Sequence, residues 1–403
     1  MSKSSSKKYC DSRFCRIIVA LIVIPISFFA FILALYILRC NEGNAISRAK
    51  TLEEGKGIVI SIDANYIDNF NEGQLVHVTG YAFTNDALTD KTFSVSVPSA
   101  IKLRRVVEMY QWKEYKHIDG QGNTYYTHSE VWSEHRIDSR RFSEKEGHHN
   151  PFMQVHGQTL VAKPVILGEL FTLSPSLVAK MNHCERLPVT EEMFKQMPKM
   201  LYERELHLNQ SNYYFGDDPN SFQIGDLRVK FEVVTPDVIS VVAKQAGSEL
   251  SAYPTQQAYS HISNHITEKT GYIELLEYGS VDAKMMFIHA RIYNFYNKLP
   301  RRIVGFVIMF VGIYMAFVVF GRLEAFMPFL SSIVEWSRGW ISLAIVAATA
   351  TLIFIGFIWI DYMPILAMIL MLIAVSLLGL LKSVHQLQEV PKHQLPEATL
   401  IEY

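Results

Sequence analysis

The sequence lacks an excess of charge of either sign. Its 38 Lys and Arg residues nearly balance 39 Asp and Glu residues, so the formal net charge is −1. Proteins that bind nucleic acid through its phosphates need a strongly basic surface. The composition therefore argues against nucleic acid as a partner.

Common enzyme motifs are also missing. The chain contains no Gly-x-Ser-x-Gly nucleophile elbow, no Gly-Lys-Ser/Thr phosphate loop and no His-Glu-x-x-His zinc helix. We therefore predict that the protein is not an enzyme and holds no cofactor.

Long apolar runs, in contrast, are abundant. Hydrophobic residues make up 49% of the chain, and four runs hold many of them. The first, 17–38, has 22 residues without a charge. As a helix it is long enough to cross a hydrocarbon core of about 30 Å, and buried helices of soluble proteins rarely contain such runs. The other three runs are 303–320, 341–360 and 363–381.

The charges near the first run predict its orientation. The N-terminal tail carries five basic residues against Asp11, and positively charged tails stay in the cytoplasm. Four spans then return the C-terminus to the cytoplasm. The predicted segments are a basic tail (1–16), transmembrane helix 1 (17–38), a lumenal or periplasmic domain (39–302), transmembrane helix 2 (303–320), a cytoplasmic interfacial segment (321–340), transmembrane helices 3 (341–360) and 4 (363–381), and a cytoplasmic tail (382–403).

These spans contain almost no polar side chains, which disfavours a channel or transporter.

The predicted outer domain contains two of the four cysteines, Cys40 and Cys184. They are able to pair only if the fold brings their backbones together, which spacing alone does not decide.

The outer domain is predicted to be rich in β-strands. Alternating or β-branched residues occur at 58–62, 74–83, 227–234 and 238–244. Residues 172–208 look more helical, because Ser174-Pro175 and Thr190-Glu191-Glu192 resemble helix starts. The expected fold class is an α+β membrane protein with four transmembrane helices and a β-rich domain between the first and second.

The densest pattern is VPSAIKLRRVVEMYQWKEY, residues 97–115. Tyr110, Trp112 and Ile118 share a face at period two, and Asp119-Gly120 follows before another aromatic run. We interpret residues 97–135 as a long two-stranded hairpin, although residues 103–110 also fit one helical face. Acidic residues at 108, 114, 130 and 134 predict cross-strand charge pairs. Whether the hairpin is a protein interface or only structural stays open.

Six histidines lie between 117 and 156, namely His117, His128, His135, His148, His149 and His156. Their spacing matches no standard zinc pattern. An alternative function is nevertheless a membrane-tethered, metal-dependent enzyme that uses this segment. The simpler interpretation is that they are ordinary surface or hairpin histidines.

The pattern from Pro98 to Trp112 resembles the signature of the LUMA (transmembrane protein 43) family. Further blocks agree in order: Asn41-Glu42-Gly43, Asn71-Glu72-Gly73-x-Leu75-Val76-His77, Gly147-His148-x-Asn150-Pro151 and Gly225-Asp226-Leu227-Arg228-Val229. The candidate interaction residues taken from these blocks are Lys102, Arg104, Arg105, Glu108, Tyr110, Trp112, His148, Asn150, Pro151, Asp226 and Arg228.

The resemblance implies a four-span membrane protein that self-associates and organises complexes of membrane proteins. In animal members it implies the endoplasmic reticulum and inner nuclear membrane, with emerin and lamins among the partners. In a bacterial member it implies the cytoplasmic membrane with a periplasmic domain. The expected partners are therefore the lipid bilayer, further copies of the chain and other membrane proteins.

Overall fold

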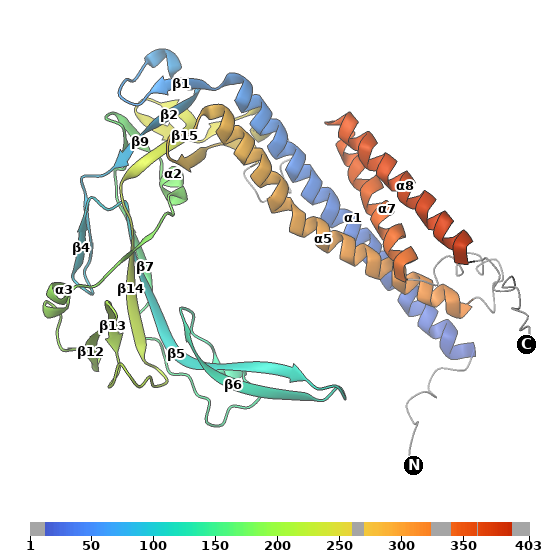
Figure 1. Ribbon diagram of the computed structural model, residues 1–403, viewed down its shortest axis with the longest axis horizontal. Helices are drawn as coiled ribbons and strands as arrows, with labels where there is room; N and C mark the ends of the chain where they lie inside the picture. The colour runs from blue at the N-terminus through green and yellow to red at the C-terminus, as the bar shows by residue number, and fades with distance from the viewer. Residues whose placement is uncertain (1–12, 260–269, 324–339, 361, 389–403) are drawn as a thin grey trace, which may run out of the picture. The chain divides into compact units, whose positions relative to one another are not determined.

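The computed structural model describes residues 13–259, 270–323, 340–360 and 362–388 (Figure 1). The chain forms two compact units. A helical unit comprises Met1–Glu54, Pro254–Tyr272 and Phe287–Tyr403, and a β-rich unit comprises Gly55–Tyr253 and Ile273–Met286. The predicted α+β class with a β-rich middle domain is confirmed. Most of the predicted interfacial segment 321–340 and most of both tails lie outside the described residues.

All four apolar runs lie in helices, which are α1 (Arg13–Ile58), α5 (Ala283–Leu323), α7 (Trp340–Trp359) and α8 (Pro364–Gln388). Among the described residues, two stretches are long and apolar enough to cross a membrane, Ile18–Ile58 and Ala283–Ala316. The apolar parts of α7 and α8 are shorter, Val346–Gly356 and Pro364–Leu377. The structure therefore supports two spans by length and composition.

Helices α1 and α5 pack closely because small residues lie at their contact. A Cβ added at Gly305 would lie 2.7 Å from the Leu38 side chain, and one at Gly312 would lie 3.1 Å from the Ser27 carbonyl oxygen. Leu38 and Met309 are fully buried in this contact. Such close approach is typical of helices that associate in membranes.

The β-rich unit contains two large sheets. The seven-stranded sheet has the order β1-β2-β8-β9-β16-β15-β19, and β2 also pairs with β15. Its strands are β1 (Ile60–Asp63), β2 (Leu75–Phe83), β8 (Ile166–Leu167), β9 (Phe171–Leu173), β15 (Asp237–Ala246), β16 (Glu249–Ser251) and β19 (Leu275–Tyr278).

The eight-stranded sheet has the order β11-β12-β13-β14-β5-β6, with β10 paired to β14 and β7 paired to β5. Its strands are β5 (Lys102–Ile118), β6 (Thr124–Ser133), β7 (Gln158–Val161), β10 (Glu185–Leu187), β11 (Met200–Leu201), β12 (Arg204–Asn209), β13 (Asn212–Phe215) and β14 (Leu227–Val234). The shorter elements are β3 (Ala87–Asp90), β4 (Val95–Pro98), β17 (Tyr253–Pro254), β18 (Tyr272–Ile273), α2 (Pro175–Lys180), α3 (Glu191–Lys195) and α4 (Gln256–Tyr259).

The predicted hairpin is confirmed. Strands β5 and β6 are antiparallel and in register from Met109 opposite Ser133 to Ile118 opposite Thr124. The loop between them is longer than a two-residue Asp-Gly turn and comprises residues 119–123. The Asp119 carboxylate closes it by accepting hydrogen bonds from the backbone amides of Gln121 and Asn123.

Residues 172–208 contain less helix than predicted. Ser174 and Thr190 do cap helices, since their hydroxyls accept from Leu177 N and Met193 N. Those helices, however, are only six and five residues long, and strands occupy much of the remaining segment. A helix this short gains little from its own hydrogen bonds, so the cap signals locate its start and not its length.

Strands β14 and β15 occur where predicted, but they do not form a hairpin. The chain leaves the eight-stranded sheet at Val234 and enters the seven-stranded sheet at Asp237. Both sheets contribute to one hydrophobic core, with Val76 and Val78 from β2 and Leu103 and Val107 from β5 among its buried members. The two sheets are thus parts of one domain.

Candidate functional site

The candidate residues on β5 alternate between the core and the opposite face of the sheet. On the core side, Arg105 is buried, and its guanidinium donates to both oxygens of Asp90 at 2.9 and 2.8 Å. Its Nε also donates to the His156 carbonyl oxygen at 3.0 Å. This pairing fixes β3 and the approach to β7 against the sheet, because a buried charge is tolerated only when it is paired.

On the opposite face, Glu108 bridges to β14. Its carboxylate accepts from Arg228 Nε and from Lys230 Nζ, both at 2.5 Å. Burial favours a higher pKa for Glu108, but the hydrogen bonds and charges of the two cations outweigh it and hold the pKa below its ordinary value. The predicted charge matching therefore occurs, but with a neighbouring strand.

An aromatic cluster lies beside this ion pair. The Tyr110 ring packs on Trp132 with ring centroids 5.2 Å apart, and Phe222 lies 5.7 Å from Tyr110. The Arg228 guanidinium lies over Trp132 at 4.5 Å. The Tyr110 hydroxyl donates to Glu130 at 2.8 Å, and this hydrogen bond raises the tyrosine pKa. The cluster joins β5, β6 and β14 on one face.

Asn150 covers the backbone edge of β5. Its Oδ1 accepts from Trp112 N at 2.7 Å and its Nδ2 donates to Trp112 O at 2.8 Å, so the amide replaces a neighbouring strand. Asn150 is fully buried. The carbonyl of the following Pro151 accepts from Arg136 Nε at 3.0 Å, and a Cβ added at Gly225 would lie 2.8 Å from the proline ring.

His148 stacks on His128 with ring centroids 3.6 Å apart and an interplanar angle of 11°. Trp112 meets His148 edge-on at 4.8 Å, and Glu114 Oε2 lies 3.4 Å from His128 Nε2. Parallel stacked rings cannot both direct nitrogen lone pairs at one ion. No group of three or more His, Cys, Asp or Glu residues within the described ranges is arranged to hold a metal.

Asp226 anchors the loop before β14. Its buried carboxylate accepts from the Tyr214 hydroxyl, from Gln223 N at 2.7 Å and from Arg204 Nη1 at 3.4 Å. Burial and this hydrogen bond raise the pKa of Tyr214. Gly216 is required here, because a Cβ would lie 2.6 Å from the Asp226 carboxylate.

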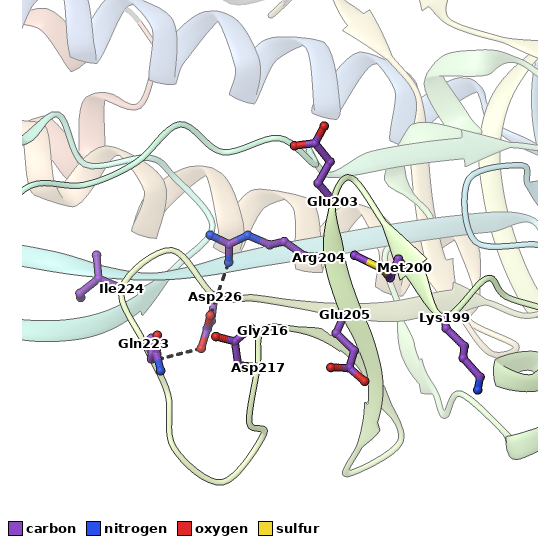
Figure 2. Close-up of a pocket in the computed structure, with 10 residues that line it drawn as sticks. All are labelled: Lys199, Met200, Glu203, Arg204, Glu205, Gly216, Asp217, Gln223, Ile224 and Asp226. Atoms are coloured by element: carbon purple, nitrogen blue, oxygen red, sulfur yellow. Dashed lines mark hydrogen bonds and ion pairs between the residues drawn. The ribbon is translucent and has the colours of Figure 1, made fainter.

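Asp226 also borders a cavity of about 580 Å³ (Figure 2). Figure 2 shows the Arg204 guanidinium and the Gln223 backbone directed at Asp226. The lining residues are Lys199, Met200, Glu203, Arg204, Glu205, Gly216, Asp217, Gln223, Ile224 and Asp226. The hydrogen bonds of Asp226 to Gln223 and Arg204 hold the loop before β14 at the border of this cavity.

The last two candidates lie at the start of β5. Lys102 Nζ donates to the carbonyl oxygens of Ala179 and Met181 at the end of α2, and burial lowers its pKa. Arg104 is exposed and pairs with Glu134 at 3.1 Å and Glu232 at 3.0 Å. Arg104–Glu134 is thus a charge pair that forms within residues 97–135, as predicted.

The fold thus brings Glu108, Tyr110, Asp226 and Arg228 together. Lys102 lies apart from them at the start of β5, and His148 lies in the segment between β6 and β7. The sequence predicts Glu130 only as a charge-pair residue and gives no role to Trp132 and Phe222, which complete the cluster with it. The signal available for two of them was register, because Tyr110 lies opposite Trp132 and Trp112 opposite Glu130.

The helical unit holds a polar cluster that sequence reasoning also missed. Glu42 on α1 is fully buried and receives two hydrogen bonds of 2.8 Å from Arg302 on α5. Trp359 Nε1 on α7 donates to the same carboxylate at 2.6 Å, and Asn41 Nδ2 donates at 3.1 Å. The signal in the sequence was the opposite charge of Glu42 and Arg302, which lie just outside two predicted spans on the same predicted side of the membrane. Cys40 beside it and Cys184 are both free thiols.

Two long apolar helices and a β-rich domain define the class, an α+β membrane protein. The family described as Transmembrane protein 43 matches residues 109–364, so the chain belongs to that family. Transmembrane protein 43 of Mus musculus is 29% identical over 84% of each chain, and that of Homo sapiens is 28% identical over 85% of this chain and 84% of its own. The Transmembrane protein 43 homolog of Drosophila melanogaster is 26% identical over 68% of this chain and 70% of its own. No solved structure matches the chain.

Proposed function

We propose that the protein is a multi-pass membrane scaffold that self-associates and organises membrane-protein complexes through its β-rich domain. The observation that carries this proposal is the chemistry of the candidate residues. Glu108, Asp226 and Arg105 each form an ion pair inside the β-rich domain. The β5–β6 hairpin, in contrast, extends beyond the other strands of its sheet. The paired side chains therefore hold the sheet together, and the extended hairpin is the part of the sheet that is available to contact other proteins.

The proposal includes four membrane spans. The cluster at Glu42 supports this topology, since it joins the end of the first predicted span, the start of the second and the end of the third. A carboxylate shared by these three ends is expected if all lie at the same membrane surface. The turn from α7 to α8 would then lie on the same side as the β-rich domain.

The location rests on the family resemblance. In a eukaryotic cell the proposal places the chain in the endoplasmic reticulum and inner nuclear membrane. In a bacterial cell it places the chain in the cytoplasmic membrane with a periplasmic domain. Microscopy of the tagged full-length chain in its own cell tests this location.

The test of self-association is the protein mass of the full-length chain, measured by light scattering in several mild detergents. A defined mass above that of one 46.1 kDa chain is expected. A monomer in every detergent would contradict the scaffold proposal.

A further inference from the structure

Strand β6 is the last strand of the eight-stranded sheet, and one of its edges has no neighbouring strand within the described residues. Tyr110 and Trp112 direct their backbone groups away from β6, toward Gly225, Asp226 and Asn150. The odd residues of β5 therefore bond to β6. Because bonding alternates along an antiparallel pair, the outward backbone groups of β6 belong to Thr124, Tyr126, His128, Glu130 and Trp132.

The two edges of this hairpin differ. On the β5 side, the chain itself covers the edge, through Gly225 N on Tyr110 O and the Asn150 amide on Trp112. The β6 edge is ten residues long and contains no proline or lysine. Natural proteins use those two residues, among other charged side chains, to block pairing at an edge. The one acidic residue of β6, Glu130, accepts a hydrogen bond from the Tyr110 hydroxyl at 2.8 Å. An unblocked edge of this length is suited to accept another strand.

The outer part of the hairpin would gain from a further strand. Beyond Met109, β14 no longer pairs with β5, and from Lys113 to Ile118 the two strands pair only with each other. Two-stranded ribbons are marginally stable in water. Tyr125 on β6 is 51% exposed there, so apolar area remains for a partner strand to cover.

We propose that β6 pairs antiparallel with β6 of a second copy of this chain, about a two-fold axis at Ser129. The backbone N–H and C=O groups that point outward from β6 belong to even-numbered residues. In the dimer these groups bond to each other, so even-numbered residues of one copy lie opposite even-numbered residues of the other. An axis at Ser129 sets Tyr126 opposite Trp132 of the second copy, and His128 opposite Glu130. Moving the axis by one residue sets Glu130 or His128 opposite itself, which places like side chains together.

This pairing rests on the proposed self-association and gives it an interface. The symmetric match favours a second copy as occupant over an unrelated strand, because one surface supplies both halves of an isologous contact. Anchoring in one membrane also holds the β-rich domains of neighbouring copies on the same side, which raises their effective concentration.

The experiment is disulfide cross-linking of full-length Ser129→Cys protein in mild detergent under gentle oxidation. At the axis the two Ser129 Cα atoms form a pair that does not exchange hydrogen bonds, about 4.5 Å apart, which suits a disulfide. The matched control is Thr127→Cys on the same face, whose two copies would lie about 14 Å apart along the strands. The unmodified chain controls for its own cysteines.

We expect at least tenfold faster dimer formation for Ser129→Cys than for Thr127→Cys. Adding Tyr126→Pro or Tyr126→Lys should abolish it, because both block the outer edge and spare the β5–β6 ladder. Equal rates for the two cysteine variants would overturn the pairing. An oligomer without the Ser129→Cys cross-link would refute this interface alone, whereas a monomer would also refute the proposed function.

Discussion

At the scale of single residues, the candidate side chains form hydrogen bonds and ion pairs with other groups of the same domain. Asn150 replaces a strand for Trp112, and Glu108 holds two cations of β14. Each of these groups is buried or half-buried, where an unpaired polar atom costs about 1–3 kcal/mol. Their patterning along the chain therefore reflects how the sheet is held together.

The lowered pKa of Glu108 makes a prediction about acid stability. A carboxyl whose pKa is lower in the folded state stabilises the fold above its unfolded pKa, and this contribution is lost as the pH falls through the folded value. We expect Glu108→Gln to lower the thermal midpoint at pH 7. The difference from the unmodified chain should shrink below about pH 4.5, the ordinary value.

Melting curves of both proteins between pH 7 and pH 3 check this. Glu191→Gln is the matched control, because Glu191 is exposed and 3.9 Å from Lys195. A difference for Glu108→Gln that stays constant down to pH 3 would show that its charge does not stabilise the sheet.

At the scale of elements, the contact between α1 and α5 depends on the absence of a side chain at Gly305. A methyl group there meets buried Leu38 at 2.7 Å. We expect Gly305→Ala to destabilise the helical unit by about 1–3 kcal/mol, the usual cost of overpacking. The double variant with Leu38→Ala should lose less than the sum of the two single changes, because the cavity receives the methyl group.

Gly43→Ala is the control, since no atom lies within 4 Å of a Cβ at that position on α1. It should be neutral or stabilise by up to about 1 kcal/mol through helix propensity. Thermal midpoints in one detergent measure all four variants. Additive losses for Gly305→Ala and Leu38→Ala would mean that the two helices do not meet there.

At the scale of the whole molecule, Glu42 on α1 connects three helices that are distant in sequence, because it accepts hydrogen bonds from Arg302 on α5 and Trp359 on α7. Arg302→Ala would leave its carboxylate buried with one cation fewer, which should destabilise the helical unit by about 3–5 kcal/mol. Arg291 offers a matched comparison, since it also joins α5 to α1, through Glu53 at 3.1 Å, but in solvent. Arg291→Ala should cost less than about 1 kcal/mol.

Unfolding of both variants in the same detergent measures the contrast. Similar losses for Arg302→Ala and Arg291→Ala would show that the buried pair is no more important than the exposed one. A large loss for Arg302→Ala alone would support a bundle in which the first, second and third predicted spans each have one end at the same level, as four spans require.

Local features of the fold were open to prediction from sequence because they depend on near neighbours. The Asp119-Gly120 turn predicts the hairpin, and alternating residues predict β14 and β15 within two residues of their ends. The hydrophobic runs predict the four helices because length and polarity alone decide whether a helix suits lipid. Helix starts at Ser174 and Thr190 were also visible, since caps are local.

By itself, the sequence determined the positions of the apolar helices, the β-rich middle domain and the existence of the β5–β6 hairpin. The tertiary structure alone decided that β14 and β15 enter different sheets, that Asn150 covers Trp112 and that Glu42 meets Arg302 and Trp359. These contacts join residues from 38 to 317 positions apart. Periodicity and turn chemistry act over a few residues, whereas the choice of a distant partner depends on the packing of the complete chain.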